Sequence, residues 1–217
     1  FAVTVPEKTP DGLRTRASTT REAFHTLDAD LLVNASFFRP FRDAWFLDYR
    51  PKVGAWTEPI GTTISDSVRY GLDRPHWPTL CVDRDGRVYL GTATERTRHA
   101  VSGRLWLVRH GEIEPLDEET IYPRTAVGLD RTGNLWIVVV DGNQPGYSEG
   151  LRLRELAALL VSLGIEDAIE LDGGGSAAIA LATSDGGREL LNRPIHTRIP
   201  RRERPVANHL GIRFSPE

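Results

Sequence analysis

The sequence contains no methionine and a single cysteine, Cys81, among its 217 residues. One cysteine excludes a disulfide within the chain and a zinc site built from several cysteine ligands. No stretch approaches the ~20 consecutive apolar residues that a membrane-spanning helix needs, so we expect no such span. Because the chain starts at Phe1 without a methionine, we expect its natural start, and any signal peptide, to lie before this numbering.

Lysine is also rare. Two of the 27 basic residues are lysines, Lys8 and Lys52, and the other 25 are arginines. An arginine excess is typical of GC-rich genomes, but it also suits ligands that carry phosphate or carboxylate groups. The formal net charge is −3, so the chain has no overall positive field of the kind that nucleic-acid binding requires. We therefore expect small or neutral partners rather than nucleic acid.

The composition is otherwise that of a globular domain, with 40% apolar and 26% charged residues. The turn Asp85-Gly86 lies between alternating apolar runs and predicts a hairpin over residues 80–90. A second hairpin is predicted over residues 125–140. Its second half, 135–140, is continuously apolar and predicts a strand buried on both faces.

Two helices are predicted. The segment Thr19-Thr20-Arg21-Glu22 forms a capping-box pattern that opens a short helix ending near Leu27. Apolar residues at helical spacing predict a second helix over residues 153–163, which Gly164 is placed to end. Helices and strands together predict a single α+β domain over residues 1–217, with a large mixed or antiparallel sheet flanked by a few helices.

Residues 39–80 have little periodicity and are expected to form long loops with short strands. Disordered segments are poor in large aromatic side chains, and this one is rich in them. Stacking on a sugar ring and packing over the sheet are the two alternatives for these rings. The aromatic residues concerned are Trp45, Phe46, Tyr49, Trp56 and Trp77.

The stretch Glu170-Leu171-Asp172-Gly173-Gly174-Gly175-Ser176 sets a carboxylate, three glycines and a hydroxyl directly after an apolar strand. Glycine has no Cβ, so consecutive glycines permit positive φ and let a ligand approach backbone N–H groups. We expect the N–H groups of Gly173, Gly174, Gly175 and Ser176 to form a nest for an anion, and Asp172 to act in catalysis. A tight turn that only reverses the chain is the structural alternative.

A second acid, Asp141, follows the apolar run 135–140 and precedes a glycine in the same way. We expect Asp141 and Asp172 to face one pocket. Which of them is base or nucleophile stays open, because that depends on the distance between the carboxylates. An Asx turn with the following glycine is the structural alternative for each.

Five short motifs occur together in the order found in phosphodiester glycosidases, and the chain resembles that family most densely from about residue 123 to 214. A sixth segment, Asn34-Ala35-Ser36-Phe37-Phe38, is similar to the family's Asn-Gly-Gly-Phe-Phe, with Ala35 and Ser36 in place of two glycines. The five motifs are Pro123-Arg124-Thr125-Ala126-Val127-Gly128, Asp141-Gly142-Asn143-Gln144-Pro145-Gly146-Tyr147-Ser148, Leu171-Asp172-Gly173-Gly174-Gly175-Ser176, Asn192-Arg193-Pro194 and Arg204-Pro205-Val206-Ala207-Asn208.

The resemblance implies hydrolysis of a sugar-1-phosphodiester at the anomeric carbon, which gives a free sugar and a phosphomonoester. Such a site must stabilise an oxocarbenium-like centre and the charge of the phosphate. We expect Asp172, Asp141 and Arg124 to be catalytic, with Arg124, Arg193 and Arg204 as phosphate ligands. The amides expected to bind sugar hydroxyls are Asn34, Gln144, Asn192 and Asn208. The resemblance also suggests a bacterial protein that is secreted or periplasmic.

Two other functions remain as alternatives: a glycosidase for another anomeric bond, such as an exopolysaccharide linkage, and a noncatalytic carbohydrate- or anion-binding module. A nucleotide-binding loop is disfavoured because the glycines lack the Gly-x-Gly-x-x-Gly and Gly-Lys-Ser/Thr patterns. None of the six histidines has metal-ligand spacing, so no metal ligand is assigned. Calcium or magnesium would find oxygen ligands at Asp141 and Asp172, but nothing in the sequence requires a cofactor. The sequence does not predict the oligomeric state.

Overall fold

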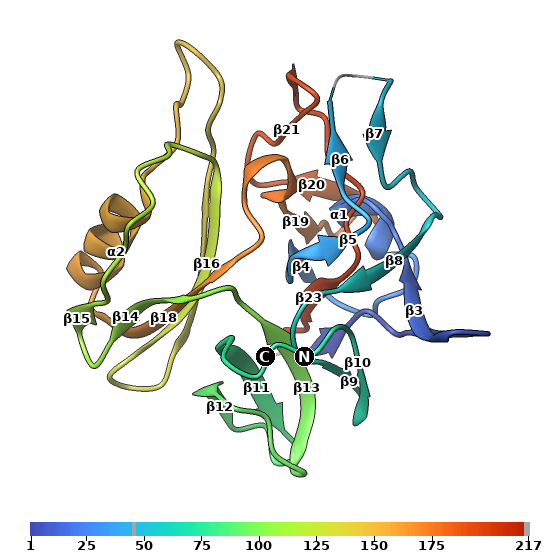
Figure 1. Ribbon diagram of the computed structural model, residues 1–217, viewed down its shortest axis with the longest axis horizontal. Coiled ribbons are helices and arrows are strands. Elements are labelled where there is room, and N and C mark those ends of the chain that lie inside the picture. The colour runs from blue at the N-terminus through green and yellow to red at the C-terminus, as the bar shows by residue number, and fades with distance from the viewer. Residues whose placement is uncertain (45–46, 215–217) are drawn as a thin grey trace.

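Three five-stranded sheets and one four-stranded sheet make up most of the computed structural model, which describes residues 1–44 and 47–214 (Figure 1). The strand pairs within the sheets are antiparallel. The expectation of few helices is confirmed, because the described residues contain two α-helices. The expectation of one large sheet is wrong: the strands are divided among several sheets, and the fold is closer to all-β than to α+β.

One five-stranded sheet positions most of the predicted site residues. Its strands are β15 (Glu112–Ile113), β14 (Trp106–Arg109), β18 (Ile165–Leu171), β16 (Arg124–Asp130) and β17 (Leu135–Val140), in that spatial order. The hairpin predicted over residues 125–140 is confirmed as β16 and β17. Arg124 pairs with Val140, and Thr125 pairs with Leu171. The last residues of β17 and β18 therefore lie beside the first residues of β16, at one end of the strands.

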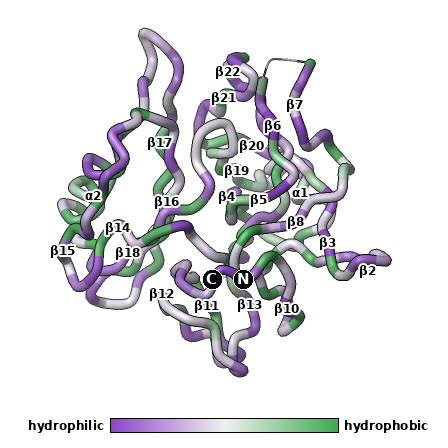
Figure 2. The backbone as a smooth tube through the Cα atoms, in the orientation of Figure 1, coloured by the Kyte–Doolittle hydropathy of each residue, from purple (hydrophilic) through white to green (hydrophobic). Residues whose placement is uncertain are grey.

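Helix α2 (Leu153–Ser162) covers one face of this sheet (Figure 1). It confirms the helix predicted over residues 153–163, and Gly164 follows it at φ +82°. The buried residues of the helix pack on apolar side chains of β14, β16 and β18, and Figure 2 shows hydrophobic segments along β14 and β16. The helix residues in this core are Leu153, Leu156, Ala157 and Leu160.

The other face of this sheet packs against the remaining two five-stranded sheets, through Val127, Ile169 and Leu171. One of them has the order β1 (Ala2–Val3), β23 (His209–Ile212), β4 (Leu31–Asn34), β19 (Ile179–Ala182) and β20 (Arg188–Leu190). The other has the order β10 (Val68–Tyr70), β9 (Thr63–Ser65), β13 (Thr97–Ser102), β11 (Thr79–Asp83) and β12 (Val88–Gly91). The hairpin predicted around Asp85-Gly86 is confirmed as β11 and β12.

Strand β17 corrects one prediction. Its apolar run does contact hydrophobic side chains on both faces, but every residue in it is only partly buried. The reason is its position at the edge of the sheet, where it has a neighbour on one side only. Sequence periodicity reports which faces are apolar and cannot report whether a strand is central or peripheral.

The remaining elements are one short helix, one further sheet and two small antiparallel pairs of strands. Helix α1 (Thr20–Ala23) has the predicted capping box at Thr19 but is shorter than expected. A four-stranded sheet contains β2 (Glu7–Thr9), β3 (Gly12–Arg16), β8 (Trp56–Pro59) and β5 (Phe38–Arg39). There are also two small antiparallel pairs: β6 (Arg42–Asp43) with β7 (Tyr49–Arg50), and β21 (Ile195–His196) with β22 (Ile199–Pro200). In the described part of the chain, neither helix is long and apolar enough to cross a membrane.

The aromatic residues predicted in 39–80 divide between several environments. Arg16 lies over the ring of Trp56, 3.8 Å from its centroid, and Trp77 packs edge-on against Phe37. Tyr49 packs edge-on against His196, with ring centroids 4.6 Å apart. Trp45 and Phe46 lie outside the described residues. Packing rather than ligand stacking accounts for the described rings.

Candidate functional site

A pocket of about 1060 Å³ opens at the end of the sheet where β16 begins and β18 ends. Its walls carry several residues expected from the sequence, namely Arg124, Gln144, Asp172, Gly173, Gly174, Gly175 and Arg204. The described lining also contains aromatic and charged side chains outside the set of assigned site residues: Phe37, Phe41, Tyr122, Asp43, Arg104, Glu118, Glu149, Glu170 and Arg198. The structure therefore joins part of the predicted set to residues from distant segments.

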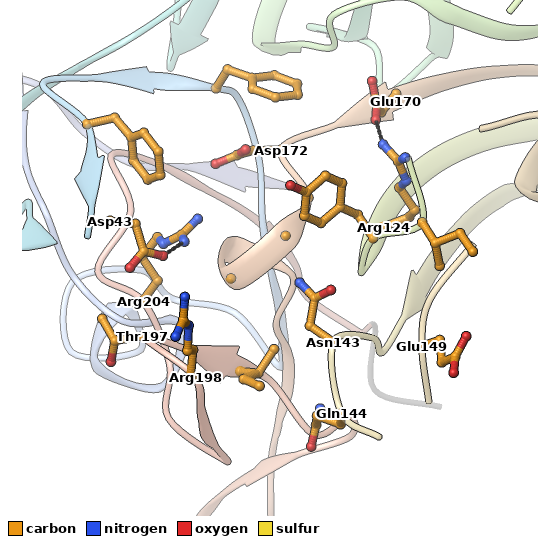
Figure 3. Close-up of a pocket in the computed structure, with 18 of the residues that line it drawn as sticks. Asp43, Arg124, Asn143, Gln144, Glu149, Glu170, Asp172, Thr197, Arg198 and Arg204 are labelled. Atoms are coloured by element: carbon orange, nitrogen blue, oxygen red, sulfur yellow. Dashed lines mark hydrogen bonds and ion pairs between the residues drawn. The ribbon is translucent and has the colours of Figure 1, made fainter. Parts of the chain in front are cut away.

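Asp172 projects into this pocket from the end of β18 (Figure 3). Its backbone is fixed on both sides: its N–H donates to the Ala35 carbonyl at 2.9 Å, and its own carbonyl accepts from Asn34 Nδ2 at 2.5 Å. The residue is only partly exposed to solvent. Its backbone is therefore tied to Asn34, the last residue of β4, and to Ala35, the residue after β4. Its carboxyl group faces the pocket.

The electrostatics of Asp172 are unusual for an aspartate. Burial raises the pKa of its carboxyl group to about 6, against the opposing effects of the Arg204 charge and a hydrogen bond with Ser176. Among the described residues Asp172 has no ion pair, whereas the buried Glu170 and the more exposed Asp43 each pair with arginine. A carboxyl group with this pKa can hold or release a proton near neutral pH.

The three glycines are required for two reasons, close contact with neighbouring atoms and a positive φ angle. A Cβ on Gly173 would lie 2.7 Å from the Pro123 carbonyl oxygen, and one on Gly175 would lie 2.6 Å from the Arg204 guanidinium. Gly174 has φ +58°, which a side chain disfavours, although its surroundings are open. The loop is therefore packed closely against its neighbours.

The predicted anion nest is only partly available. The Gly174 N–H donates to the Pro123 carbonyl and the Ser176 N–H donates to the Gly173 carbonyl. At most the N–H groups of Gly173 and Gly175 remain for a ligand. The glycines serve close packing first, and any anion contact would come from fewer donors than the sequence suggested.

Asp141 does not line the pocket, contrary to the expectation that it faces Asp172 there. Its carboxylate accepts from the Arg193 N–H at 2.9 Å, from Asn192 Nδ2 at 2.8 Å and from the Tyr147 hydroxyl at 3.0 Å. These donors join the end of β17 to the segment that leads into β21. Asp141 is thus a positioning residue in this structure, because its hydrogen-bonding capacity is directed at the protein.

The amides predicted to bind sugar hydroxyls also bond to the protein. Asn34 is fully buried and bridges the Asp172 carbonyl, the Thr125 hydroxyl and the Ala178 N–H. Asn208 accepts from the Ser36 N–H, and Asn192 accepts from the Ile179 N–H. The described pocket lining includes none of these three side chains. They hold the loops around the pocket in place.

Gln144 lines the pocket but its amide is already oriented by the protein. Its Nε2 donates to the Arg193 carbonyl at 2.7 Å, and its Oε1 is buried without a partner among the described residues. Arg193 is not on the pocket wall; its guanidinium lies over the ring of Tyr147. Neither residue presents the contact that was predicted for it.

Arg124 takes part in a ring of four charges on one wall of the pocket. Its Nη1 donates to Glu170 at 2.9 Å, its Nη2 to Glu118 at 3.0 Å and its Nε to the Leu151 carbonyl at 3.0 Å. Arg104 contacts the same two glutamates, at 3.0 and 2.6 Å. Burial raises the pKa of Glu170, while Arg104 and Arg124 act in the opposite direction.

A second charged group lies across the pocket (Figure 3). Arg204 is ion-paired with Asp43, donates to the Ser176 hydroxyl at 3.2 Å and contacts His196 Nδ1 at 3.4 Å. Burial, and then the Arg204 charge, lower the pKa of His196 to about 4, so its ring is neutral at pH 7. In Figure 3, Asp172 lies between this Asp43–Arg204 pair and the Glu170–Arg124 pair.

The turn between β21 and β22 supplies a further arginine. Thr197 and Arg198 form a two-residue turn with φ +52° and φ +64°, since His196 pairs with Ile199. Both residues line the pocket, and Arg198 is exposed. Hairpin turns of this kind usually contain Asn or Gly, so the backbone here is strained.

Residues 28–213 match the phosphodiester glycosidase family. The chain belongs to that family. It is 28% identical, over 76% of its length, to human N-acetylglucosamine-1-phosphodiester α-N-acetylglucosaminidase, and it spans about a third of the length of that relative, 34%.

Solved structures show the same fold. The catalytic domain of the zebrafish N-acetylglucosamine-1-phosphodiester α-N-acetylglucosaminidase, auto-inhibited by its pro-peptide, superposes with a TM-score of 0.71 at 24% identity, covering 99% of this chain and 73% of that one. An exported-protein candidate from Burkholderia pseudomallei K96243 superposes with a TM-score of 0.65 at 14% identity, covering 98% and 71%. These likenesses show that this chain shares its fold with the zebrafish catalytic domain and with the Burkholderia protein.

For this member of the phosphodiester glycosidase family, sequence reasoning missed Glu170, Arg104, Glu118 and Asp43. Glu170 carried a signal, because it is a charged residue within an otherwise apolar run and lies two residues before Asp172. The structure places Glu170, near the end of β18, and Asp172, the residue after β18, in the lining of the same pocket. Arg104, Glu118 and Asp43 lie in segments without motifs, and nothing local in the sequence marks them.

Within the described residues, no group of three or more His, Cys, Asp or Glu side chains is arranged to hold a metal ion. The two acids considered for calcium or magnesium, Asp141 and Asp172, are directed to different surroundings. The protein N–H and hydroxyl donors around Asp141 already use its oxygen atoms.

Proposed function

We propose that this protein is a glycoside hydrolase that cleaves a sugar-1-phosphodiester at the anomeric carbon. The observation that supports this best is Asp172, a carboxyl group without an ion pair among the described residues, in a pocket whose walls carry arginines on both sides of it. Such a pocket suits a neutral sugar attached to an anionic phosphate. The relatives are named for an N-acetylglucosamine-1-phosphodiester, and we extend that substrate class to this chain.

The reaction needs little acid catalysis, because a phosphomonoester is a good leaving group. The bond between the anomeric carbon and the bridging oxygen breaks, and the oxygen leaves with the phosphate. Water adds to the anomeric carbon and gives up a proton. We assign Asp172, as a carboxylate, to this carbon, either as the base that takes the proton or as a nucleophile that water later displaces.

The pocket walls supply the other requirements. Phe37, Phe41 and Tyr122 offer aromatic faces for the apolar side of a sugar ring. Arg104, Arg124, Arg198 and Arg204 offer positive charge for the phosphate. Asn34, Asp141, Asn192 and Asn208 hold the loops that carry these groups. Arg193 is placed with this supporting set rather than with the phosphate ligands.

The test is sugar release from a panel of sugar-1-phosphodiesters and aryl glycosides, with N-acetylglucosamine-1-phosphodiesters included. Release from the phosphodiesters alone is the expected result. Release from aryl glycosides alone would move the protein to the first alternative, a glycosidase for other anomeric bonds. Saturable binding of the phosphodiesters without any turnover would indicate a binding module. Export of the protein is also proposed, on the family resemblance and the exported-protein candidate among the structural relatives.

A further inference from the structure

The charge ring on the pocket wall contains two glutamates that bridge the same two arginines. Glu170 contacts Arg124 at 2.9 Å and Arg104 at 3.0 Å, and Glu118 contacts Arg124 at 3.0 Å and Arg104 at 2.6 Å. Each carboxylate thus spans both guanidinium groups. The two glutamates perform the same electrostatic task, although their surroundings are very different.

Glu170 belongs to the framework. It lies in β18, which has a hydrogen-bonded neighbour on each side, and its side chain is only 1% exposed. Breaking its contacts would leave a buried carboxylate without a partner, which is strongly unfavourable. Glu170 is therefore a permanent partner of Arg104 and Arg124.

Glu118 belongs to a segment between β15 and β16 that has no helix or strand. No backbone-to-backbone hydrogen bond joins residues 115–121 to other described residues. The Glu118 side chain is 29% exposed and lines the pocket. Neighbouring contacts anchor the segment independently, through Leu116 in the core and Glu119 on Arg152. Rotation of the Glu118 side chain alone would take its carboxylate away from Arg104 and Arg124, while Arg124 Nη2 would keep its bond with the Thr120 carbonyl, 2.6 Å away.

Charge decides what can replace Glu118. Without it, two guanidinium groups face one carboxylate, which leaves a charge of +1. A phosphodiester carries a charge of −1 and has two unesterified oxygens, so it matches a carboxylate both in charge and in its ability to bridge two arginines. A neutral hydroxyl or a sugar ring would leave the excess charge unpaired.

The location is also suitable for the reaction. Glu170 and Asp172 line the same pocket, near the end of β18 and just after it. Arg104 and Glu170 both act electrostatically on the Asp172 carboxyl group. A phosphate held by Arg104 and Arg124 would thus lie next to the carboxylate assigned to the anomeric carbon. Arg204, across the pocket, is already tied to Asp43 and Ser176.

We propose that the Glu118 carboxylate holds the place of the substrate phosphate, and that a bound phosphodiester displaces it from Arg104 and Arg124. The proposal rests on the proposed function for the identity of the substrate. It assigns the phosphate to the Arg104 and Arg124 wall rather than to Arg198 or Arg204. It also gives Arg124 the phosphate contact expected from the sequence, shared with an arginine that the sequence did not mark.

The test measures binding and turnover separately. Calorimetry with diethyl phosphate, a phosphodiester that has no sugar, reports on the arginine wall without any reaction. Triethyl phosphate, which is uncharged, is the control ligand. We expect Glu118→Ala to bind diethyl phosphate about tenfold more tightly than the unchanged protein, because no carboxylate has to be displaced. Arg104→Ala in the same background should abolish the gain.

Glu119→Ala is the matched control, since Glu119 is the adjacent acid and pairs with Arg152 away from the pocket lining. It should leave diethyl phosphate affinity unchanged. Unchanged or weaker binding by a folded Glu118→Ala variant would overturn the proposal. Loss of binding in Arg198→Ala together with normal binding in Arg104→Ala would overturn it as well.

Turnover tests the proposed function instead: with active enzyme, Glu118→Ala should lower KM several-fold and leave kcat within about twofold. Absence of turnover on every phosphodiester would count against the proposed function only, because calorimetry still decides the role of Glu118.

Discussion

Asp141 and Asp172 have the same sequence context and different surroundings. Each follows the last residue of an apolar strand, each precedes glycine, and their strands flank β16 on its two sides. Asp141 accepts hydrogen bonds from Asn192, Arg193 and Tyr147, which satisfy its carboxylate. Asp172 has Ser176 as its side-chain partner and a raised pKa. The difference teaches that the supply of nearby donors, rather than the motif, separates a structural acid from a reactive one.

Replacing Asp172 by asparagine should have the largest effect on this comparison. The amide keeps the shape of the side chain but cannot take a proton or attack carbon, so turnover should fall by about 10³-fold. Sugar release from an N-acetylglucosamine-1-phosphodiester is the measurement. Activity within tenfold of the unchanged protein would remove Asp172 from the chemistry.

The same variant makes a prediction about stability. An acid whose pKa is higher in the folded protein than in the unfolded chain resists ionisation on folding, so stability falls as pH rises from roughly 4 to about 6. At pH 7 that loss is complete. At pH 7, Asp172→Asn should therefore raise the free energy of unfolding by up to about 3 kcal/mol, measured by chemical denaturation. At pH 4 the same variant should gain little. Equal gains at both pH values would contradict the raised pKa.

Asp141→Asn should show the opposite pattern. The N–H groups of the new amide would face the N–H donors of Asn192 and Arg193, and two donors cannot form a hydrogen bond. The free energy of unfolding should therefore fall by about 1–3 kcal/mol. Turnover should fall less than in Asp172→Asn, through displacement of the segment that carries β21. Chemical denaturation and sugar release are measured on one preparation. A stable variant with activity as low as Asp172→Asn would restore Asp141 to the catalytic group.

The pH dependence of turnover sharpens the role of Asp172. If its carboxylate is the reactive form, kcat/KM should rise through a pKa near 6 and level off above it. A fall above pH 6 would instead make Asp172 an acid. Ser176→Ala removes a hydrogen bond that favours the carboxylate, so the rising limb should move to higher pH, by less than about one unit. Thr132→Ala, in the turn between β16 and β17 at the other end of these strands, should leave the limb in place.

Tyr147→Phe should have the smallest effect. It removes one of the donors to Asp141, at 3.0 Å, on an exposed side chain. The expected loss of stability is small because the hydrogen bond is exposed, and turnover should stay within twofold. Thermal unfolding and sugar release check both values. A large loss of activity would show that the loop at 143–149 contacts substrate through Tyr147.

The sequence was a good guide where local chemistry decides the structure. The hairpins around Asp85-Gly86 and at 125–140, the capping box at Thr19 and the end of helix α2 at Gly164 depend on turn and cap preferences of a few adjacent residues. Antiparallel pairing brings the end of β18, where the triple-glycine loop begins, to Arg124 at the start of β16.

Features that depend on distant neighbours could not be read in this way. The edge position of β17 is set by the order of strands, and the partners of Asn34 and Asn208 lie 138 and 172 residues away. A lone sequence shows an amide at a strand end but not which atoms surround it. Glu118 and Arg104 were missed for the same reason, because only the folded chain brings them to Arg124.

The turn at Thr197 and Arg198 limits how far this protein can be made heat-resistant. Its two positive φ angles suit Asn-Gly, so a programme of stabilisation would select that replacement early and gain about 1 kcal/mol for each relaxed position. The same exchange would strip the pocket of an exposed guanidinium. A thermostable derivative intended for industrial use should therefore be relaxed at other left-handed positions, such as Arg201 or His110, before this hairpin is altered.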